Sequence, residues 1–109
     1  MLKLWGNRCA VSDSETLDAI RASHIKPWRS STDKERLDPK NGLPLIASLD
    51  ALFDAGLISF DESGKLIVSS MLRAKERDIF GINNASLKRM PAQETLECLT
   101  YHRNHIFHK

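Results

Sequence analysis

The sequence predicts a single α+β domain, and three observations support this prediction. The chain has 109 residues, which suits one domain of ordinary size. Short apolar runs bounded by turn-forming residues predict strands. Two later segments, 47–55 and 92–107, carry apolar residues at helical spacing and predict helices. We therefore expect one domain over residues 1–109, either as a whole protein or excised from a longer one.

The composition is that of an ordinary globular protein. Hydrophobic residues make up 41% of the chain and charged residues 28%, as in soluble domains generally. No apolar run approaches the roughly 18 residues that span a bilayer, and no basic and apolar leader opens the chain. We therefore expect a cytoplasmic location and no membrane partner. Cys9 and Cys98 lie far apart, so they predict neither a disulfide framework nor a zinc knuckle.

The first part of the chain predicts short elements. The opening MLKLWG reads as the last turns of a helix closed by its final glycine. Residues 8–11, RCAV, fit a short strand. Residues 21–25 also predict a strand, although 15–22 fits a helix as well. Pro27 ends this element because it has no N–H to donate.

The middle of the chain predicts a loop, a strand and a helix. Residues 28–42 are polar and rich in turn formers, which predicts an exposed loop. A loop of that length in a small domain is uncommon without a function. The run GLPLI that follows is restricted by Pro44 to an edge strand. Residues 47–55 predict a helix that Ser48 caps and Gly56 ends. Its apolar stripe consists of Leu49, Leu52 and Phe53.

The last part predicts a hairpin and two helices. The runs LISF and KLIVS flank the turn-forming DESG, which predicts a β-hairpin. Residues 70–79 predict a helix weakly. Residues 92–107 predict a longer helix entered after Pro91. Its candidate core positions are Leu96, Leu99, Ile106 and Phe107.

Charge is distributed unevenly although its sum is small. The formal net charge is +2, too small to indicate a nucleic-acid partner by itself. Within residues 41–70, Lys65 is the sole cation, and the anions are Asp50, Asp54, Asp61 and Glu62. Both flanking segments carry more basic than acidic residues. An acidic centre between basic flanks suits a cation site facing a polyanion, and it also suits an ordinary surface.

Three sets of residues are candidates for catalysis or metal binding: His24, Asn41, and the pair Asp50 and Asp54. The two aspartates are four residues apart in a predicted helix, so they share one face and repel each other. A hard divalent cation would reverse that repulsion. Each set also has an ordinary explanation. His24 could be a structural histidine, Asn41 a turn residue, and the aspartates solvated surface groups.

The sequences that flank His24, Asn41 and Asp50 resemble those of a known family. ASHIKPW around His24, NGLPL after Asn41, and FDAGLI after Asp50 together resemble the H-N-H endonucleases. The YHR segment at 101–103 is similar to that of a subgroup that includes nuclease domains of modification-dependent restriction enzymes. The resemblance runs from about Trp5 to Phe107. It implies a ββα-metal (His-Me finger) core, here with an added hairpin and peripheral helices.

The resemblance also implies roles for individual residues in DNA phosphodiester hydrolysis. His24 matches the general base that takes a proton from water, and Asn41 matches the residue that pins the loop and orients that base. Asp50 falls where most members have a histidine metal ligand, and Asp54 falls at a further ligand position one turn later. Ser23 replaces the Asp or His that often precedes the base, and it is a poor ligand. The resulting H-N-D variant favours one Mg²⁺ or Mn²⁺ ion over zinc.

The resemblance implies DNA as partner. A charged loop can hold phosphates without reading sequence, or it can simply be solvated. The candidate DNA-binding residues are Lys26, Arg29, Lys34, Arg36, Lys40 and Arg103. One active site cuts one strand, so double-strand cleavage would require a homodimer, and target recognition would require a fused domain. Alternatives are a catalytically inactive DNA-binding module and a nuclease acting on RNA or single strands. His102, His105 and His108 could bind a metal, but they fit surface positions of a terminal helix better.

Overall fold

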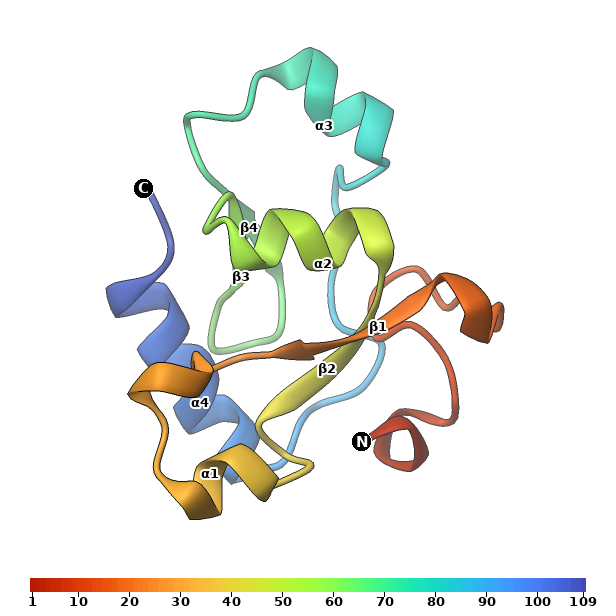
Figure 1. Ribbon diagram of the computed structural model, residues 1–109. Helices are drawn as coiled ribbons and strands as arrows, with labels where there is room; N and C mark the ends of the chain where they lie inside the picture. Colours follow the sequence, from red (N-terminus) through yellow and green to blue (C-terminus); the bar gives the residue numbers. More distant parts are fainter.

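Two small antiparallel sheets form the centre of the protein, and a computed structural model describes all residues, 1–109. Strand β1 (Ile20–His24) pairs with β2 (Gly42–Ile46), and β3 (Ile58–Phe60) pairs with β4 (Leu66–Val68). Helix α2 (Ala47–Asp54) follows β2 directly and packs against both β1 and β2 (Figure 1). The fold is therefore mixed α+β, with a ββα segment, an added hairpin and further helices. None of these helices combines the length and apolar composition needed to cross a membrane.

The register of β1 and β2 brings the ends of the long loop together. Ile20 lies opposite Ile46, and His24 lies opposite Gly42. Residue 41 therefore enters β2 beside the point where His24 leaves β1. Strand β2 has one partner strand only, so it is an edge strand, as Pro44 predicted. The observed β1 begins one residue before the predicted 21–25 and ends at His24.

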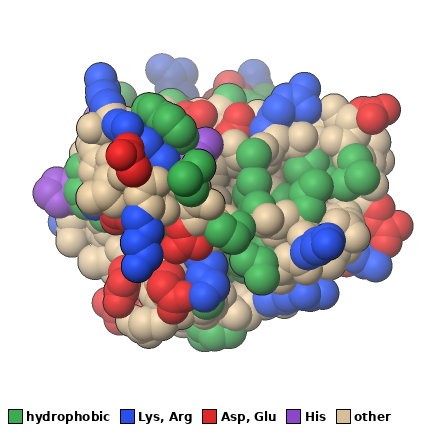
Figure 2. All heavy atoms as spheres, turned by 60° about the horizontal axis from the view of Figure 1, so that its bottom comes forward, with side chains coloured by type: hydrophobic (Ala, Val, Ile, Leu, Met, Phe, Trp, Pro, Cys, Tyr) green, Lys and Arg blue, Asp and Glu red, His purple; other side chains and the backbone are tan.

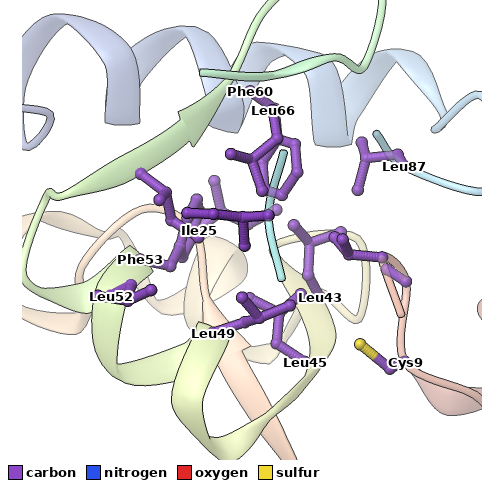
Figure 3. Close-up of a cluster of buried hydrophobic side chains, with 14 of the residues drawn as sticks. Cys9, Ile25, Leu43, Leu45, Leu49, Leu52, Phe53, Phe60, Leu66 and Leu87 are labelled. Carbon is purple, nitrogen blue, oxygen red and sulfur yellow. The ribbon is translucent and has the colours of Figure 1, made fainter. Parts of the chain in front are cut away.

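Helix α2 is anchored by its apolar stripe. Leu49, Leu52 and Phe53 are buried, and Figure 3 shows them in one cluster with Ile25, which follows β1, and Leu43 of β2. These contacts fix the helix on the sheet and leave its acidic face outside. The predicted cap at Ser48 is wrong. The helix starts one residue after β2, so Ile46 occupies the N-cap position and no side chain caps it.

Gly56 ends α2 in the left-handed conformation, with φ 74°. A β-carbon at this position would lie 2.2 Å from the carbonyl oxygen of Ile106, closer than any real contact. The carbonyl of Gly56 accepts a hydrogen bond from the His108 backbone N–H at 2.9 Å. The segment after α4 therefore lies directly on the end of α2.

The segment 28–42 is more ordered than the predicted open loop. A 3₁₀ turn spans Trp28–Ser30, and helix α1 spans Asp33–Leu37. The Thr32 hydroxyl accepts a hydrogen bond from the Glu35 N–H, and the Glu35 carboxylate accepts one from the Thr32 N–H. This capping box is a sequence signature of a helix start, so the Thr32–Glu35 spacing could have predicted α1.

The remaining elements agree in part with the sequence. The opening is a 3₁₀ turn, Leu2–Trp5, closed by Gly6, and a second 3₁₀ turn spans Leu17–Ala19. Residues 8–11 do not form a strand. They are irregular. The Ala10 N–H donates to the Pro44 carbonyl, and the Ala10 carbonyl accepts from the Lys88 N–H, so the segment is held in place without pairing in a sheet.

The C-terminal helices form close to the predicted positions. Helix α3 (Ala74–Phe80) starts four residues after the predicted 70–79 and buries no residue. Helix α4 (Gln93–His105) matches the predicted segment and packs against β3. Leu99 is its fully buried core residue, and Leu96 is partly buried against the same core. Ile106 and Phe107 lie beyond the helix and are half-buried.

Candidate active site

His24 ends β1 with its side chain exposed. Alternation along the strand turns Ser23 to the core and His24 to solvent. The His24 imidazole meets the Trp28 indole edge-to-face, with 5.8 Å between ring centroids and 85° between planes. Sequence reasoning missed this contact. The available signal was a large aromatic residue four positions after His24 in an otherwise polar segment.

Asn41 is buried, with 2% of its surface exposed, and its amide is fully engaged. Its Oδ1 accepts a hydrogen bond from the Lys26 backbone N–H at 2.8 Å. Its Nδ2 donates to the backbone carbonyls of Lys26 at 3.4 Å and Glu35 at 3.3 Å. The amide thus ties the segment after His24 to α1. A plain turn residue would not be buried with these partners.

Asp50 and Asp54 lie one turn apart on α2, and Asp54 interacts electrostatically with His24. Asp54 is exposed as a whole residue, yet its carboxyl is partly desolvated. This desolvation raises the pKa of Asp54, the Asp50 carboxylate raises it further, and His24 opposes the increase. The Asp50 carboxylate and the His24 imidazole therefore both act on the Asp54 carboxyl.

A hollow of about 470 Å³ lies between His24 and the end of α2. Asp54, Trp28 and Arg29 are among the residues that line it. Three histidines from the C-terminal segment, His102, His105 and His108, also line the hollow.

Ser23 does not provide an oxygen ligand beside His24. Its side chain is 1% exposed and lies on the opposite face of β1. Its hydroxyl is the buried side-chain polar group that lacks a hydrogen-bond partner. The departure noted in the sequence therefore corresponds to a residue directed into the core.

Most of the predicted DNA-binding cations already have partners within the protein. Lys26 pairs with Glu35 at 3.0 Å, Lys40 pairs with Glu94, and Arg36 pairs with Asp33 at 3.3 Å. Arg103 donates to the Phe60 carbonyl at 2.7 Å. Figure 2 shows lysine and arginine side chains interspersed with acidic ones on the face that it presents.

Arg29 and Lys34 differ from these four cations. Both are exposed, and Arg29 lines the same hollow as His24 and Asp54. Of the six candidate cations, Arg29 is therefore the one that lines the same hollow as His24 and Asp54.

His102 is a structural histidine of α4, so the expectation of a surface position is wrong for this residue. It is 2% exposed. Its Nε2 must carry the proton, because the group it contacts at 2.9 Å, the Phe53 carbonyl, can only accept. Its Nδ1 therefore accepts from the Ser59 hydroxyl at 2.8 Å. His105 and His108 are exposed, as expected.

Comparison with known families identifies the central segment. Residues 9–61 match the sequence model of the HNH endonucleases. This stretch contains β1, β2 and α2, together with His24, Asn41, Asp50 and Asp54. Residues 9–61 are therefore an HNH endonuclease domain, and the protein is a phosphodiester hydrolase that acts on nucleic acid. No curated protein matches the chain significantly.

HNH endonucleases generally use a divalent metal ion. The structure gathers no set of three His, Cys, Asp or Glu side chains able to enclose an ion. The donors at hand are the two carboxylates on the exposed face of α2. This set fits a hard cation such as magnesium, which protein sites bind through one or two carboxylates together with water and substrate phosphate.

Proposed function

We propose that this domain hydrolyses DNA phosphodiester bonds, with His24 as the general base. Asp50 and Asp54 would hold one divalent cation, Mg²⁺ or Mn²⁺. The observation that carries the proposal is the position of His24 at the end of β1, in electrostatic contact with the Asp54 carboxyl across an open hollow. A structural histidine would be buried and bonded, as His102 is. His24 is exposed instead, where water and substrate can reach its ring.

The chemistry assigned to His24 is proton transfer from water. A ring nitrogen accepts the proton as the water oxygen forms a bond to phosphorus and the bond from phosphorus to the leaving oxygen breaks. The leaving oxygen then takes a proton from solvent. Asn41 keeps the chain after His24 in place through its bonds to Lys26, so the imidazole need not be reoriented for each turnover.

Asp50 and Asp54 are the residues that would bind the cation. When bound, such an ion stabilises negative charge on the phosphate oxygens. Carboxylate oxygens favour magnesium or manganese over softer ions. Without the ion, the Asp50 carboxylate raises the pKa of Asp54. Arg29 and Lys34 would contact phosphates on either side, since both are exposed and neither is paired with an acidic residue.

Parallel digestion of three substrates tests this function. Duplex plasmid, single-stranded DNA and RNA are incubated with the purified protein in Mg²⁺, in Mn²⁺ and after exhaustive chelation with EDTA. We expect DNA cleavage that requires added metal. Full activity after chelation and dialysis would contradict the assignment of Asp50 and Asp54, and cleavage of RNA alone would contradict DNA as the substrate.

A further inference from the structure

Trp28 is exposed to an extent that packing does not explain. More than half of its surface, 54%, is accessible. An indole buries a large apolar area when it serves a core, and Trp5 of this chain does so, with 6% exposed. Trp28 instead lies in a polar segment beside the active site. An exposed aromatic side chain at a nuclease site is able to bind a ligand from outside the protein.

The Trp28 ring is held firmly despite its exposure. The Arg36 guanidinium lies over the ring, 4.8 Å from the centroid, and its Nε donates to the Trp28 carbonyl at 2.8 Å. Asp33 in turn pairs with Arg36 at 3.3 Å. The Ser31 hydroxyl donates to the Pro27 carbonyl at 2.8 Å, which fixes the turn beneath the ring. The indole is therefore held in one orientation before any ligand binds, with the Arg36 guanidinium against its ring.

The position of this surface relates it to the reaction. Trp28 lines the same hollow as His24 and Asp54, and its ring contacts the His24 ring directly. A phosphate placed between His24 and Asp54 would bring the adjacent nucleotide within reach of the indole. Arg29, the next residue, is the exposed cation of that hollow and would contact the backbone of the same strand.

We propose that Trp28 stacks on the nucleobase next to the scissile phosphate, so that the enzyme prefers single-stranded or locally opened DNA to closed duplex. In a closed duplex both faces of each base are covered by neighbouring bases, whereas a single strand leaves them free to stack on an aromatic side chain. Such stacking is tolerant of sequence because every base has a π-face. The inference rests on the proposed function and specifies its substrate class.

Binding measured without turnover tests the stacking. A fluorescein-labelled short thymidine oligonucleotide is compared with an abasic oligonucleotide of the same length, which keeps the phosphates and lacks the bases. Fluorescence anisotropy in EDTA gives Kd for both. We expect the parent protein to bind the base-containing strand roughly 5- to 150-fold more tightly, the range typical of one stacked base. Trp28→Leu should bind the two strands equally, and Trp28→Phe should keep most of the difference.

Two controls separate stacking from other roles of the indole. Ile79→Ser removes another exposed apolar side chain, on α3, where 63% of the residue is accessible, and should leave the Kd ratio unchanged. Trp28 fluorescence should be quenched by the base-containing strand more than by the abasic one, because Trp5 is buried. Trp28→Phe lacks this signal and identifies its source.

Several outcomes would overturn the proposal. If Trp28→Leu weakens binding to both strands by the same factor, or changes cleavage rate without changing the Kd ratio, Trp28 only positions His24. Faster cleavage of closed duplex than of single strands by the parent protein would also overturn it. A parent protein that binds as expected but cuts nothing would refute the proposed hydrolysis and leave the stacking supported.

Discussion

The imidazole of His102 lies flat against the ring of Phe53, with 3.8 Å between centroids and 2° between planes. The same imidazole donates to the Phe53 carbonyl. Phe53 directly precedes Asp54, so this pair fixes the end of α2 to α4 at the position where the acidic face meets the hollow. A residue from the last part of the chain thus supports a site built by the first part.

Acid should destabilise the protein through His102. Burial lowers the pKa of His102 to about 4, whereas an unfolded histidine has a pKa of about 6.5. The unfolded state therefore binds the proton first. The stabilising contribution is complete above pH 6.5 and is lost as the pH falls towards 4, by on the order of 3 kcal/mol in the free energy of unfolding. Urea titrations across this range measure the slope.

Two variants, His102→Gln and His108→Gln, test whether His102 causes this dependence of stability on pH. His102→Gln is expected to be less stable at neutral pH and to show a flatter dependence between pH 6.5 and 4, because the titrating group is gone. His108 is exposed, so His108→Gln should keep the parental slope. A parental slope in His102→Gln would assign the acid sensitivity to another group.

Removal of the Asn41 amide should cost both stability and activity. Asn41→Ala leaves the partly buried Lys26 N–H without its partner, which costs about 1–3 kcal/mol. The segment after His24 should loosen, and cleavage should slow as well. Asn104, exposed on α4, provides the control, since Asn104→Ala should unfold at the parental urea concentration. Equal midpoints for the two variants would mean that the Asn41 bonds contribute nothing.

His24→Ala should cut DNA about 10²–10⁴-fold more slowly, the usual effect of losing a general base. Because the side chain is exposed, its free energy of unfolding should change by less than about 0.5 kcal/mol. Added imidazole should restore part of the activity of His24→Gly by occupying the vacated space. Cleavage at the parental rate would refute the mechanism, and loss of folding would make His24 structural.

Substitutions at Asp50 should change the preference for metal. Asp50→His removes a charge beside Asp54, so Mg²⁺ should support less cleavage, while nickel, cobalt or zinc should gain relative to it. Asp50→Asn should be much weaker with every ion because it loses the charge without gaining a nitrogen ligand. Glu62, exposed in the hairpin turn, is the control through Glu62→Gln. Equal plasmid cleavage by all variants in all metals would mean that Asp50 is an ordinary surface residue.

The elements that the sequence predicted well are those with a strong local period. Strand β2, helix α2, the β3–β4 hairpin and α4 all combine a regular apolar pattern with Gly or Pro at an end. The prediction at 8–11 is wrong because burial of RCAV comes from contacts with β2 and the segment near Lys88, not from pairing in a sheet. Helix α1 was missed because it has no buried residue, so only its capping box reveals it.

The site could be predicted by residue type but not by partner. The spacing of His24, Asn41 and Asp50 is visible in the sequence, whereas the amide bonds of Asn41 join positions that folding brings together. The pairing of Lys26 with Glu35 and of Lys40 with Glu94 depends on tertiary structure. A count of cations therefore overestimates the number available to DNA. The exposure of Trp28 and its contact with the Arg36 guanidinium likewise depend on tertiary structure, which no periodicity reveals.

The close approach at Gly56 has a consequence for how the chain could be divided. The absence of a side chain there lets the backbone of Ile106 reach the end of α2. Ile106 itself lies outside residues 9–61, which match the nuclease family. A fragment cut at residue 61 would keep the candidate site residues His24, Asn41, Asp50 and Asp54 and lose the His102 ring that covers Phe53. Residues 9–61 contain the match to the nuclease family, whereas the folded domain also includes the C-terminal segment. Shuffling this nuclease into another protein would require moving both.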